Sequence, residues 1–551
     1  MQKKENCKYI FVVGGVISGV GKGITASSIG LILKNRGLSV TAIKIDPYIN
    51  IDAGTMNPTE HGEVFVLKDG DECDQDMGNY ERFLEVELTR INYMTTGRVY
   101  LTVIEKERNL EYKGKNVEVV PDIPLEVIRR IKTAQKNSNA DIVIVEIGGT
   151  VGEYQNMLFL EAARMMKIEN PKDVFFVMVS YLPTPGIIGE MKTKPTQNAV
   201  RTLNASGIQP DFLIARGATI LDEKRKEKLS SLCNLFPDRI ISAPDVKSIY
   251  DIPVNFEKEK LSDKLCGLIG LVCRKPDLAA WKKWKNFANK SHNGKEVVKI
   301  AMIGKYFETG DFVLSDSYLS VIEALKYSAY AQNKKPVMSW LNATDFEKDP
   351  KKLNKLKNYD GIVVPGGFGS RGVEGILSAV HFARENKIPY FGLCYGMQMM
   401  VIEYARNILK LKDANTREIN PKGNNLVIDV MESQKEILKN NLYGGSMRLG
   451  EYKAVIRPNT IASKAYGKKE VLERHRHRYE VNPAYIKELE SKGLIFSGSS
   501  PDGHLMEIAE LPKNVHPFFL GTQFHPEFLA HPLSPHPLFS AFIKACVGNK
   551  K

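Results

Sequence analysis

The chain has 551 residues, and its 77 Lys and Arg against 64 Asp and Glu give a formal net charge of +13. This excess fits phosphate-bearing ligands better than nucleic acid, because no nucleic-acid recognition motif accompanies it. Seven cysteines without a Cys-x-x-Cys pair argue against a disulfide framework or a zinc site. No segment approaches the roughly 18 apolar residues of a membrane span, so we expect a soluble, cytoplasmic protein that uses no membrane.

The N-terminal half begins with a predicted phosphate-binding loop. The apolar run Tyr9–Val13 is typical of a buried strand, the glycine-rich segment 14–23 follows it, and a helical pattern then continues to Leu33. Strand, glycine-rich loop and helix form an arrangement that cradles phosphate groups, although a glycine-rich segment can also be an ordinary turn.

This loop departs from the usual P-loop spacing at two positions. Val16 stands where a glycine is usual, and Gly23 replaces the Ser or Thr whose hydroxyl binds magnesium. We therefore expect magnesium to be held by carboxylates elsewhere, with Asp74, Asp76 and Glu146 as candidates.

Apolar runs that alternate with helical patterns predict an α/β fold of two domains, each with a mostly parallel sheet flanked by helices. The strands expected in the first domain are Tyr9–Val13, Val40–Ile45, Asp141–Ile147, Val174–Val179 and Asp211–Ile214. Those expected in the second are Val298–Ile303, Gly361–Val364 and Pro389–Leu393. Residues 275–296 carry a proline at position 276 and end in polar residues, so we expect domains at 1–274 and 297–551 joined by a linker at 275–296.

Cys394 is the candidate nucleophile of the C-terminal half. It lies in a Gly-x-Cys-x-Gly segment between a predicted strand and a helical pattern over 397–406, so its thiol is expected at a strand-to-helix elbow. The start of a helix favours the thiolate form. A buried structural cysteine is the competing interpretation, because free cysteine is among the most buried residue types.

Two other segments supply the partners of a catalytic thiol. His525 and Glu527 follow the apolar run 517–523, and a histidine base with a carboxylate to orient it completes a triad. The glycine-rich segment 364–371 follows a predicted strand, and its backbone N–H groups could form an oxyanion hole.

From about residue 297 onward, these motifs in this order resemble a class I glutamine amidotransferase domain. The resemblance implies that Cys394, His525 and Glu527 hydrolyse glutamine through a thioester and release ammonia. It also implies an oxyanion hole at Gly366, Gly367 and Tyr395, and a glutamine site formed by Gln398, Glu418 and Arg478.

Arg478 lies in the segment 473–480, where histidine and arginine alternate. That pattern could otherwise indicate a metal site or a nucleic-acid patch. A metal is disfavoured, because His475 and His477 stand two apart on an extended segment without a further ligand nearby.

Motifs in the N-terminal half closely resemble the synthetase domain of the CTP synthase family, at residues 44–50, 57–63, 76–82, 146–150 and 192–197. The resemblance covers nearly the whole chain. It implies a P-loop-like, dethiobiotin-synthetase-like synthetase domain followed by the amidotransferase domain. The implied reaction is the last step of de novo CTP synthesis, in which ATP phosphorylates the uracil 4-oxygen of UTP and ammonia channelled from the glutamine site displaces phosphate.

The resemblance assigns roles to residues of this chain, with Mg²⁺ bound by Asp76 and Glu146 and no organic prosthetic group. Lys22 would contact the transferred phosphoryl group, and Lys44 would steady the phosphates and the developing oxyanion. The implied ATP residues are Ser18, Gly19, Val20, Gly21, Lys22, Gly23 and Asp76. The implied UTP or CTP residues are Ser18, Lys44, Glu153, Tyr154, Gln155, Lys192, Gln197 and Lys228, and the implied ammonia tunnel is lined by Pro58, His61 and Val64.

Gln155 departs from the family pattern, which usually has a glutamate there that helps to recognise the pyrimidine. A glutamine side chain both donates and accepts hydrogen bonds, so we hypothesise weakened or altered feedback inhibition by CTP. The resemblance further implies activation by GTP and a homotetramer, with filament formation left open.

Two other interpretations remain. Cobyrinic acid amidating enzymes share the domain order but use another acceptor, and the segments 44–48 and 192–197 favour a nucleotide acceptor instead. A non-catalytic nucleotide-sensing scaffold is the second alternative, and the intact Cys394, His525 and Lys22 argue against it.

Overall fold

The computed structural model describes residues 7–186, 189–294, 296–304, 308–309, 312–313, 315–431, 434, 439–440 and 444–549. The chain divides into two compact units. The first contains residues 1–52 and 76–288, and the second contains residues 53–75 and 289–551. Segment 53–75 therefore lies between elements of the first unit in sequence but belongs to the second unit.

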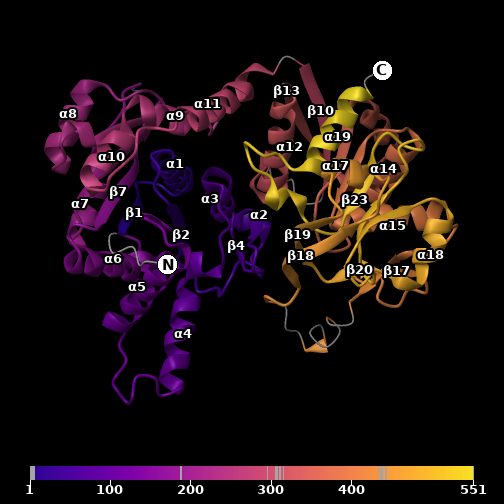
Figure 1. The fold of residues 1–551 in the computed structure, drawn as a ribbon, viewed down its shortest axis with the longest axis horizontal. Coiled ribbons are helices and arrows are strands. Elements are labelled where there is room, and N and C mark those ends of the chain that lie inside the picture. The colour runs from indigo at the N-terminus through magenta and orange to yellow at the C-terminus, as the bar shows by residue number, and fades with distance from the viewer. Residues whose placement is uncertain are drawn as a thin grey trace. The chain divides into compact units, whose positions relative to one another are not determined.

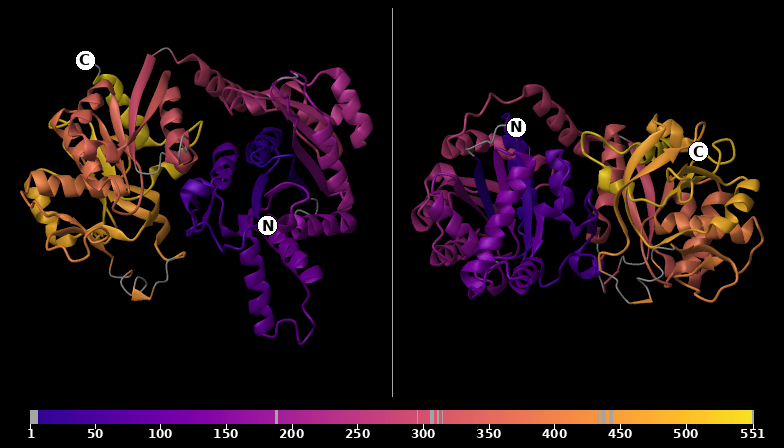
Figure 2. Two further views of the ribbon diagram at one scale, coloured as in Figure 1. Left: turned by 180° about the vertical axis from the view of Figure 1, so that it is seen from behind. Right: turned by 60° about the horizontal axis from the view of Figure 1, so that its bottom comes forward.

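The first unit is built on a seven-stranded parallel sheet (Figures 1 and 2). Its strand order is β5 (Tyr93–Thr95), β2 (Val40–Asp46), β6 (Ile142–Ile147), β1 (Lys8–Gly15), β7 (Val174–Tyr181), β8 (Phe212–Gly217) and β9 (Ile240–Pro244). The five strands predicted here are confirmed. The two that were not predicted are the edge strands β5 and β9.

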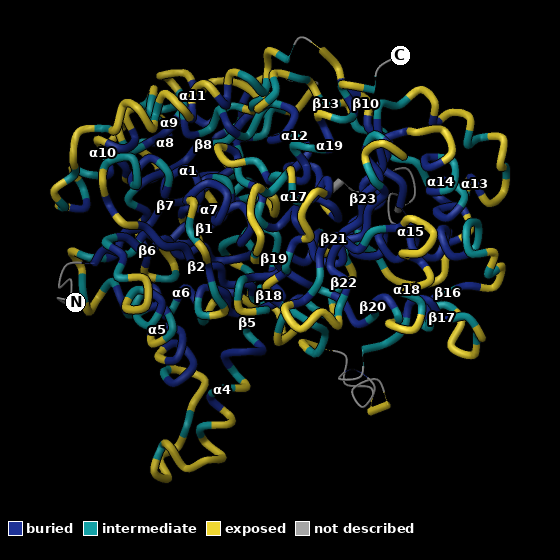
Figure 3. Tube along the Cα trace, turned by 45° about the vertical axis from the view of Figure 1, so that its right-hand side comes forward, coloured by how far each residue is buried: buried dark blue, intermediate teal, exposed yellow. Residues whose placement is uncertain are grey.

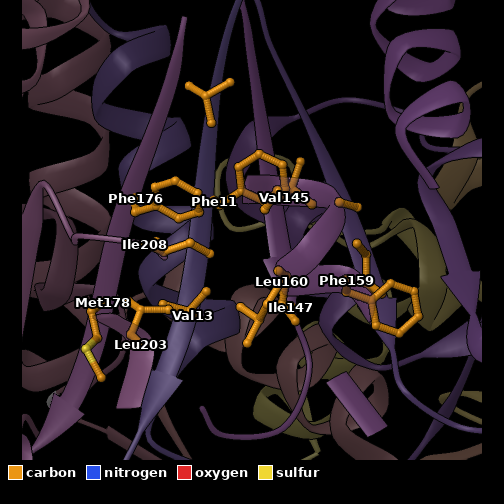
Figure 4. Close-up of a cluster of buried hydrophobic side chains, with 14 of the residues drawn as sticks. Phe11, Val13, Val145, Ile147, Phe159, Leu160, Phe176, Met178, Leu203 and Ile208 are labelled. Atoms are coloured by element: carbon orange, nitrogen blue, oxygen red, sulfur yellow. The ribbon is translucent and has the colours of Figure 1, made fainter. Parts of the chain in front are cut away.

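Helices cover both faces of this sheet, which explains why its central strands are apolar on both sides. On one face lie α1 (Lys22–Lys34), α3 (Asp76–Leu84) and α9 (Asp251–Lys258), and the other is covered mainly by α5 (Val119–Ser138), α6 (Met157–Glu169) and α7 (Lys194–Ala205). Figure 4 shows the core on the second face, where Phe11 and Val13 of β1 pack with Phe159 and Leu203. The remaining helices of this unit are α4 (Thr96–Arg108), α8 (Glu223–Cys233) and α10 (Leu261–Ile269).

One disulfide corrects the expectation drawn from the cysteine count. Cys266 of α10 is bonded to Cys273, with their Cα atoms 6.1 Å apart. The chain reverses after α10, where Gly270 has a left-handed conformation with φ 65°, and this turn brings the two thiols together. The other five cysteines form no disulfide and are buried.

The expected linker contains α11 (Leu278–Asn293). Trp284 of this helix is buried in the first unit, where it packs with Phe83 and Tyr250 and donates a hydrogen bond from its indole nitrogen to the Tyr250 carbonyl. In the part of the chain that the structure describes, no helix combines the length and the apolar character needed to cross a membrane.

The second unit is built on a nine-stranded sheet in which the first five strands are parallel and the last four antiparallel. The strand order is β13 (Lys334–Asn342), β10 (Glu296–Gly304), β14 (Gly361–Val364), β15 (Tyr390–Leu393), β23 (Phe519–Thr522), β22 (Met506–Glu510), β21 (Ile495–Ser499), β18 (Arg448–Ile456) and β19 (Glu470–His477). The three strands predicted for this half are confirmed, and they lie in the parallel part.

The other elements of the second unit pack around this sheet. Its main helices are α12 (Leu319–Ala331), α13 (Ala343–Lys348), α14 (Val373–Glu385), α15 (Tyr395–Asn407), α17 (Ile461–Tyr466), α18 (Pro483–Ser491) and α19 (Pro537–Gly548). A small sheet contains β16 (Asn415–Thr416), β17 (Leu426–Val430) and β20 (Tyr479–Val481), and β11 (Glu308–Thr309) pairs with β12 (Phe312–Val313). Segment 53–75 adds α2 (Pro58–His61), β3 (Val64–Val66) and β4 (Glu72–Asp74).

Candidate functional site

Cys394 occupies the turn between β15 and α15, as the sequence predicts. Its backbone has φ 49° and ψ −96°, an unusual conformation for a residue with a side chain, and its N–H donates to the Thr522 carbonyl at 2.6 Å. A Cβ on Gly396 would lie only 2.2 Å from the Val364 carbonyl oxygen, so the glycine permits the tight turn. The thiol is thereby held at the start of α15, where the helix dipole favours negative charge.

His525 lies beside this thiol and is oriented by Glu527. Nδ1 of His525 is 2.7 Å from Oε1 of Glu527, and both side chains are buried. Burial lowers the pKa of His525, but the charges of Glu527 and Cys394 outweigh burial and raise it to about 10. The geometry therefore favours an imidazolium at His525, with Nε2 left to exchange a proton with the Cys394 sulfur.

A cavity within the second unit opens onto these groups. Its lining brings together the thiol, its base, the glycine-rich loop and segment 53–75. The lining residues are Pro58, Glu63, Val64, Ser317, Tyr318, Val321, Gly366, Gly367, Phe368, Cys394, Arg476, His525, Glu527 and Phe528. Of the three residues expected in a tunnel, Pro58 and Val64 are in this lining and His61 is not.

The expected oxyanion loop lies at the edge of the cavity. Gly366 and Gly367 line it, and the hydroxyl of Tyr395 donates to the Gly369 carbonyl at 3.0 Å. Glu418 accepts a hydrogen bond from the Gly369 N–H at 2.7 Å. Two of the predicted site residues therefore hold the loop in place through their side chains.

Gln398 and Arg478, which the sequence assigns to glutamine, make protein contacts in this structure. Nε2 of Gln398 donates to the Tyr479 carbonyl at 3.1 Å and to Oε1 of Gln523 at 3.3 Å. A guanidinium nitrogen of Arg478 donates to Oε1 of Gln434 at 2.7 Å. Neither side chain lines the cavity.

Sequence analysis did not select two residues that touch the nucleophile. Nε2 of Gln523 lies 3.6 Å from the Cys394 sulfur, and the sulfur lies 3.8 Å from the Arg476 carbonyl oxygen. Arg476 also pairs with Glu72 at 2.8 Å and lies over the ring of Phe368. The available signals were the position of Gln523 two residues before His525 and that of Arg476 two residues before Arg478.

The histidines of segment 473–480 belong to a buried polar cluster. Nδ1 of His475 is 2.9 Å from Nε2 of His477, and Arg448 donates to Glu480 at 3.1 Å and to Glu507 at 2.8 Å. Burial lowers the pKa of both histidines and, together with the charge of Glu507, raises the pKa of Glu480. Among the described residues, no group of three or more His, Cys, Asp or Glu side chains is arranged to hold a metal ion.

In the first unit, the glycine-rich loop joins β1 to α1 as predicted. Gly19 and Gly21 have positive φ angles of 71° and 88°. Lys22 begins α1, and its ammonium donates to the Gly149 carbonyl at 2.8 Å. Burial lowers the pKa of Lys22. The loop therefore places a buried lysine beside backbone groups at the carboxyl end of β1, where α/β sheets bind ligands.

Lys44 connects the two predicted magnesium ligands. Its ammonium lies 2.5 Å from Oδ2 of Asp76 and 2.8 Å from Oε1 of Glu146, and Tyr80 donates to the other oxygen of Glu146. Burial raises the pKa of Glu146. Burial would also raise the pKa of Asp76, but Lys44 outweighs it and the pKa falls below its usual value.

The residues expected to recognise the pyrimidine begin with Glu153, which closes a turn after β6. Its Oε1 accepts hydrogen bonds from the N–H and hydroxyl of Thr150 at 2.8 and 2.6 Å. Nε2 of Gln155 donates to the other Glu153 oxygen at 3.1 Å, and Tyr154 is 90% exposed. These three side chains are therefore local neighbours.

In the part of the chain that the structure describes, Lys192 and Gln197 contact only residues close to them in sequence. Lys192 pairs with Glu190 at 2.6 Å, Gln197 donates to Thr193, and Lys228 is exposed on α8. The structure groups Asp76 and Glu146 around Lys44, whereas Asp74 lies in β4 of the second unit.

Comparisons with known proteins agree with this division of sites. Residues 8–271 match the family described as CTP synthase N-terminus, and residues 313–545 match glutamine amidotransferase class-I. A CTP synthase from Thermococcus gammatolerans is 49% identical over 545 residues, covering 98% of this chain and 99% of the relative. A CTP synthase from Carboxydothermus hydrogenoformans is 48% identical and covers 99% of each chain.

Solved structures were also similar to the C-terminal half. The glutaminase domain of a Trypanosoma brucei CTPS with bound acivicin is 35% identical, with a TM-score of 0.42, and the match covers 46% of this chain and 95% of that chain.

The fold and the two sites thus define a glutamine-hydrolysing ligase, in which an amidotransferase unit is fused to an ATP-dependent synthetase. The chain belongs to the CTP synthase family, whose members convert UTP to CTP with nitrogen from glutamine. This membership decides against another amide acceptor.

Proposed function

We propose that Cys394 attacks glutamine, with His525 as the acid and base and Glu527 as the orienting carboxylate. The observation that carries this proposal is that all three line one cavity, with His525 and Glu527 2.7 Å apart. Attack of the thiolate on the side-chain carbonyl carbon forms a tetrahedral intermediate, whose oxyanion would accept from backbone N–H groups of the 366–367 loop and of Tyr395. His525 gives a proton to the departing ammonia, then takes one from the water that hydrolyses the thioester and frees the thiolate.

Gln398, Glu418 and Arg478 remain the proposed holders of glutamine. Arg478 would exchange its contact with Gln434 for the substrate carboxylate, which a guanidinium can bind in a bidentate way. Both hydrogens of the Gln398 amide are already donated, so this residue can offer only its oxygen to the substrate.

Segment 53–75 is proposed as the exit for ammonia. Pro58 and Val64 belong to this segment and line the cavity that holds Cys394, which supports a passage beginning there. His61 is kept in the proposal as a later tunnel residue, because it ends the same short helix. A closed passage protects ammonia from protonation in water, and only the neutral form is a nucleophile.

In the synthetase unit, Lys22 and Lys44 are proposed to neutralise the phosphates of ATP and the negative charge that develops on the uracil oxygen. The fit of Mg²⁺ rests on the donor set, because Asp76 and Glu146 both place carboxylate oxygens beside the Lys44 ammonium, and Mg²⁺ prefers such ligands. When bound, the metal would neutralise phosphate charge. The residues proposed to contact ATP are those of the loop 18–23 with Asp76.

The proposed UTP and CTP residues are Ser18, Lys44, Glu153, Tyr154, Gln155, Lys192, Gln197 and Lys228. GTP as activator and CTP as feedback inhibitor belong to the same proposal, as does a cytoplasmic location, where nucleotides are made. The proposed domain limits are 1–274 and 297–551 with a linker at 275–296, and the matched ranges 8–271 and 313–545 fall within them.

A homotetramer assembled through the first unit is supported by exposed apolar side chains on and near α4 and α5. This arm extends away from the sheet of its unit (Figure 1), and much of its surface is exposed (Figure 3). Its exposed apolar residues include Leu101, Ile104, Leu110, Val119, Val120 and Leu125. An apolar patch of this kind usually marks an interface.

The experiment that tests the whole proposal follows ultraviolet absorbance while the protein is incubated with UTP, ATP and magnesium. One reaction receives glutamine with GTP, and the other receives an ammonium salt. Formation of the cytosine ring in both supports a synthetase with a coupled glutaminase. Formation with ammonium alone contradicts coupling, and no product in either contradicts the proposed synthetase site.

A further inference from the structure

Gln523 is a fully buried side chain in contact with the proposed nucleophile. It directly follows β23, and its backbone N–H donates to the Glu507 carbonyl at 2.8 Å. The preceding residue, Thr522, accepts the Cys394 N–H, so both residues are anchored on the same strand end. Strand pairing thus fixes the Gln523 amide beside the sulfur.

The direction of the hydrogen bonds determines which end of the Gln523 amide faces the sulfur. The Tyr479 carbonyl can only accept, so the nitrogen of the Gln398 amide must face it, at 3.1 Å. The second hydrogen of that nitrogen goes to Oε1 of Gln523, at 3.3 Å. Oxygen at this position leaves Nε2 of Gln523, a donor only, 3.6 Å from the Cys394 sulfur.

Besides His525 and Gln523, the Arg476 carbonyl oxygen lies near the sulfur, at 3.8 Å. A thiol can donate to that oxygen, whereas a thiolate cannot. When the proton moves to His525, the amide N–H of Gln523 becomes the neutral donor that faces the new negative charge. A hydrogen bond to a charged group is stronger than one between neutral groups, particularly where water is excluded.

We propose that Gln523 is a further catalytic residue, whose amide N–H stabilises the Cys394 thiolate both before attack on glutamine and when the thioester is hydrolysed. This inference rests on the proposed role of Cys394 as the nucleophile. The hydrogen bonds from Gln398 to the Tyr479 carbonyl and to Oε1 of Gln523 hold the Gln523 amide with its nitrogen toward the sulfur. They link the segment after Arg478 to the sulfur.

The test compares the wild type with Gln523→Met, which keeps the length and removes the donor, and with Gln523→Glu, which places a carboxylate beside the sulfur. Gln332→Met is the matched control, because Gln332 is in the same unit and its amide donates to the Ser540 carbonyl instead. The rate of alkylation of Cys394 by iodoacetamide is measured against pH in the full chain, with the modified peptide followed by mass spectrometry.

We expect the midpoint of the alkylation profile to rise by about one to two pH units in Gln523→Met, and further in Gln523→Glu. The limiting rate at high pH should increase about threefold for each unit, because a more basic thiolate is a better nucleophile. Glutamine hydrolysis at pH 7 should fall roughly 10- to 100-fold. Synthesis from an ammonium salt should stay unchanged, because it takes place in the first unit.

An unchanged midpoint in both variants, or a lower limiting rate with no shift, would overturn the inference and assign Gln523 to packing alone. Failure of the wild type to hydrolyse glutamine would contradict the proposed function, whereas the alkylation profiles would still decide whether Gln523 stabilises the thiolate. If Gln523→Met does not fold, Gln523→Glu and the control supply the comparison.

Discussion

The carboxylate of Asp76 occupies the space beside Gly23 that a side chain would need. A Cβ built on Gly23 would lie 2.1 Å from Oδ1 of Asp76. The usual P-loop has a Ser or Thr hydroxyl at this position to bind magnesium. In this chain the carboxylate of Asp76, at the start of α3, fills that place and also contacts Lys44. The glycine at position 23 therefore leaves the room that the Asp76 carboxylate occupies.

The first prediction follows from that contact. Gly23→Ala should displace Asp76 from Lys44 and lower ammonia-dependent synthesis about 10-fold or more, because small misplacements of charged groups are costly in phosphoryl transfer. Glutamine hydrolysis should be retained. Gly267→Ala is the control, since a Cβ there meets no atom within 4 Å. Equal synthesis rates in both variants would contradict the prediction, and initial rates at varied ATP concentration provide the measurement.

A second prediction separates the two sites. Cys394→Ala should abolish glutamine-dependent synthesis and leave ammonia-dependent synthesis intact, because the thiol lies only in the amidotransferase cavity. Lys22→Ala should stop synthesis from either nitrogen source and preserve glutamine hydrolysis. Product formation and glutamate release are measured in parallel for both variants. Loss of both activities in Cys394→Ala would count against two separable sites.

How far the sequence could predict these sites depends on how local each contact is. The elbow at Cys394 and the loop before Lys22 were predicted because strand, turn and helix are adjacent in sequence. Gln523 and Arg476 reach the sulfur from positions 129 and 82 residues away in sequence, and no local pattern specifies such contacts. The extended segment expected around His475 and His477 is strand β19, but its pairing partner β18 and the contact of Arg476 with Glu72, 404 residues away, could not be predicted from local patterns.

A third prediction concerns pH. The pKa of His525 is raised from 6.5 to about 10, so the imidazolium persists at neutral pH and is lost as the pH rises through 10. The ion pair with Glu527 therefore contributes stability below pH 6.5 that disappears as the pH approaches and passes 10. The kcat/KM for glutamine hydrolysis should also decline as the pH approaches and passes 10, because the imidazolium must protonate the leaving ammonia. This decline is the alkaline limb of the pH profile.

Replacing the orienting carboxylate tests the cause of this limb. Glu527→Gln removes a charge that raises the pKa of His525, so the limb should move to lower pH by about one unit or more. Glu490→Gln serves as the control, because that carboxylate pairs with Arg457 at the surface. A limb at the same pH in all three proteins would show that His525 does not control it.

The fourth prediction concerns the buried cluster around Arg448. Arg448→Met leaves Glu480 and Glu507 buried without their cation, which typically costs about 3–5 kcal/mol. Burial and Glu507 raise the pKa of Glu480, so in the variant the folded state binds protons more readily than the unfolded state. Stability should therefore fall as the pH rises from 5 to 8.

Urea unfolding of the second unit measures the free energy of unfolding of the wild type and of Arg448→Met at each pH. Arg457→Met, which breaks a surface pair, should cost about 0.5 kcal/mol or less. A similar small loss in Arg448→Met, independent of pH, would indicate that the cluster is hydrated or already neutral.

The last prediction concerns Gln155 and feedback by CTP. Its amide donates to Glu153 at 3.1 Å, so its oxygen is the group left to meet a ligand, whereas a glutamate would present a second carboxylate beside Glu153. A carboxylate accepts more strongly from the exocyclic amino group of cytosine than a neutral amide does, and UTP has no such donor. Gln155→Glu should therefore strengthen inhibition by CTP by about 10-fold, with little change in the KM for UTP.

Gln209→Glu, at an amide whose nitrogen contacts the Cys233 carbonyl, controls for the added charge. The inhibition constant is measured in ammonia-dependent synthesis so that the glutaminase does not contribute, and an unchanged constant would remove Gln155 from the recognition of CTP.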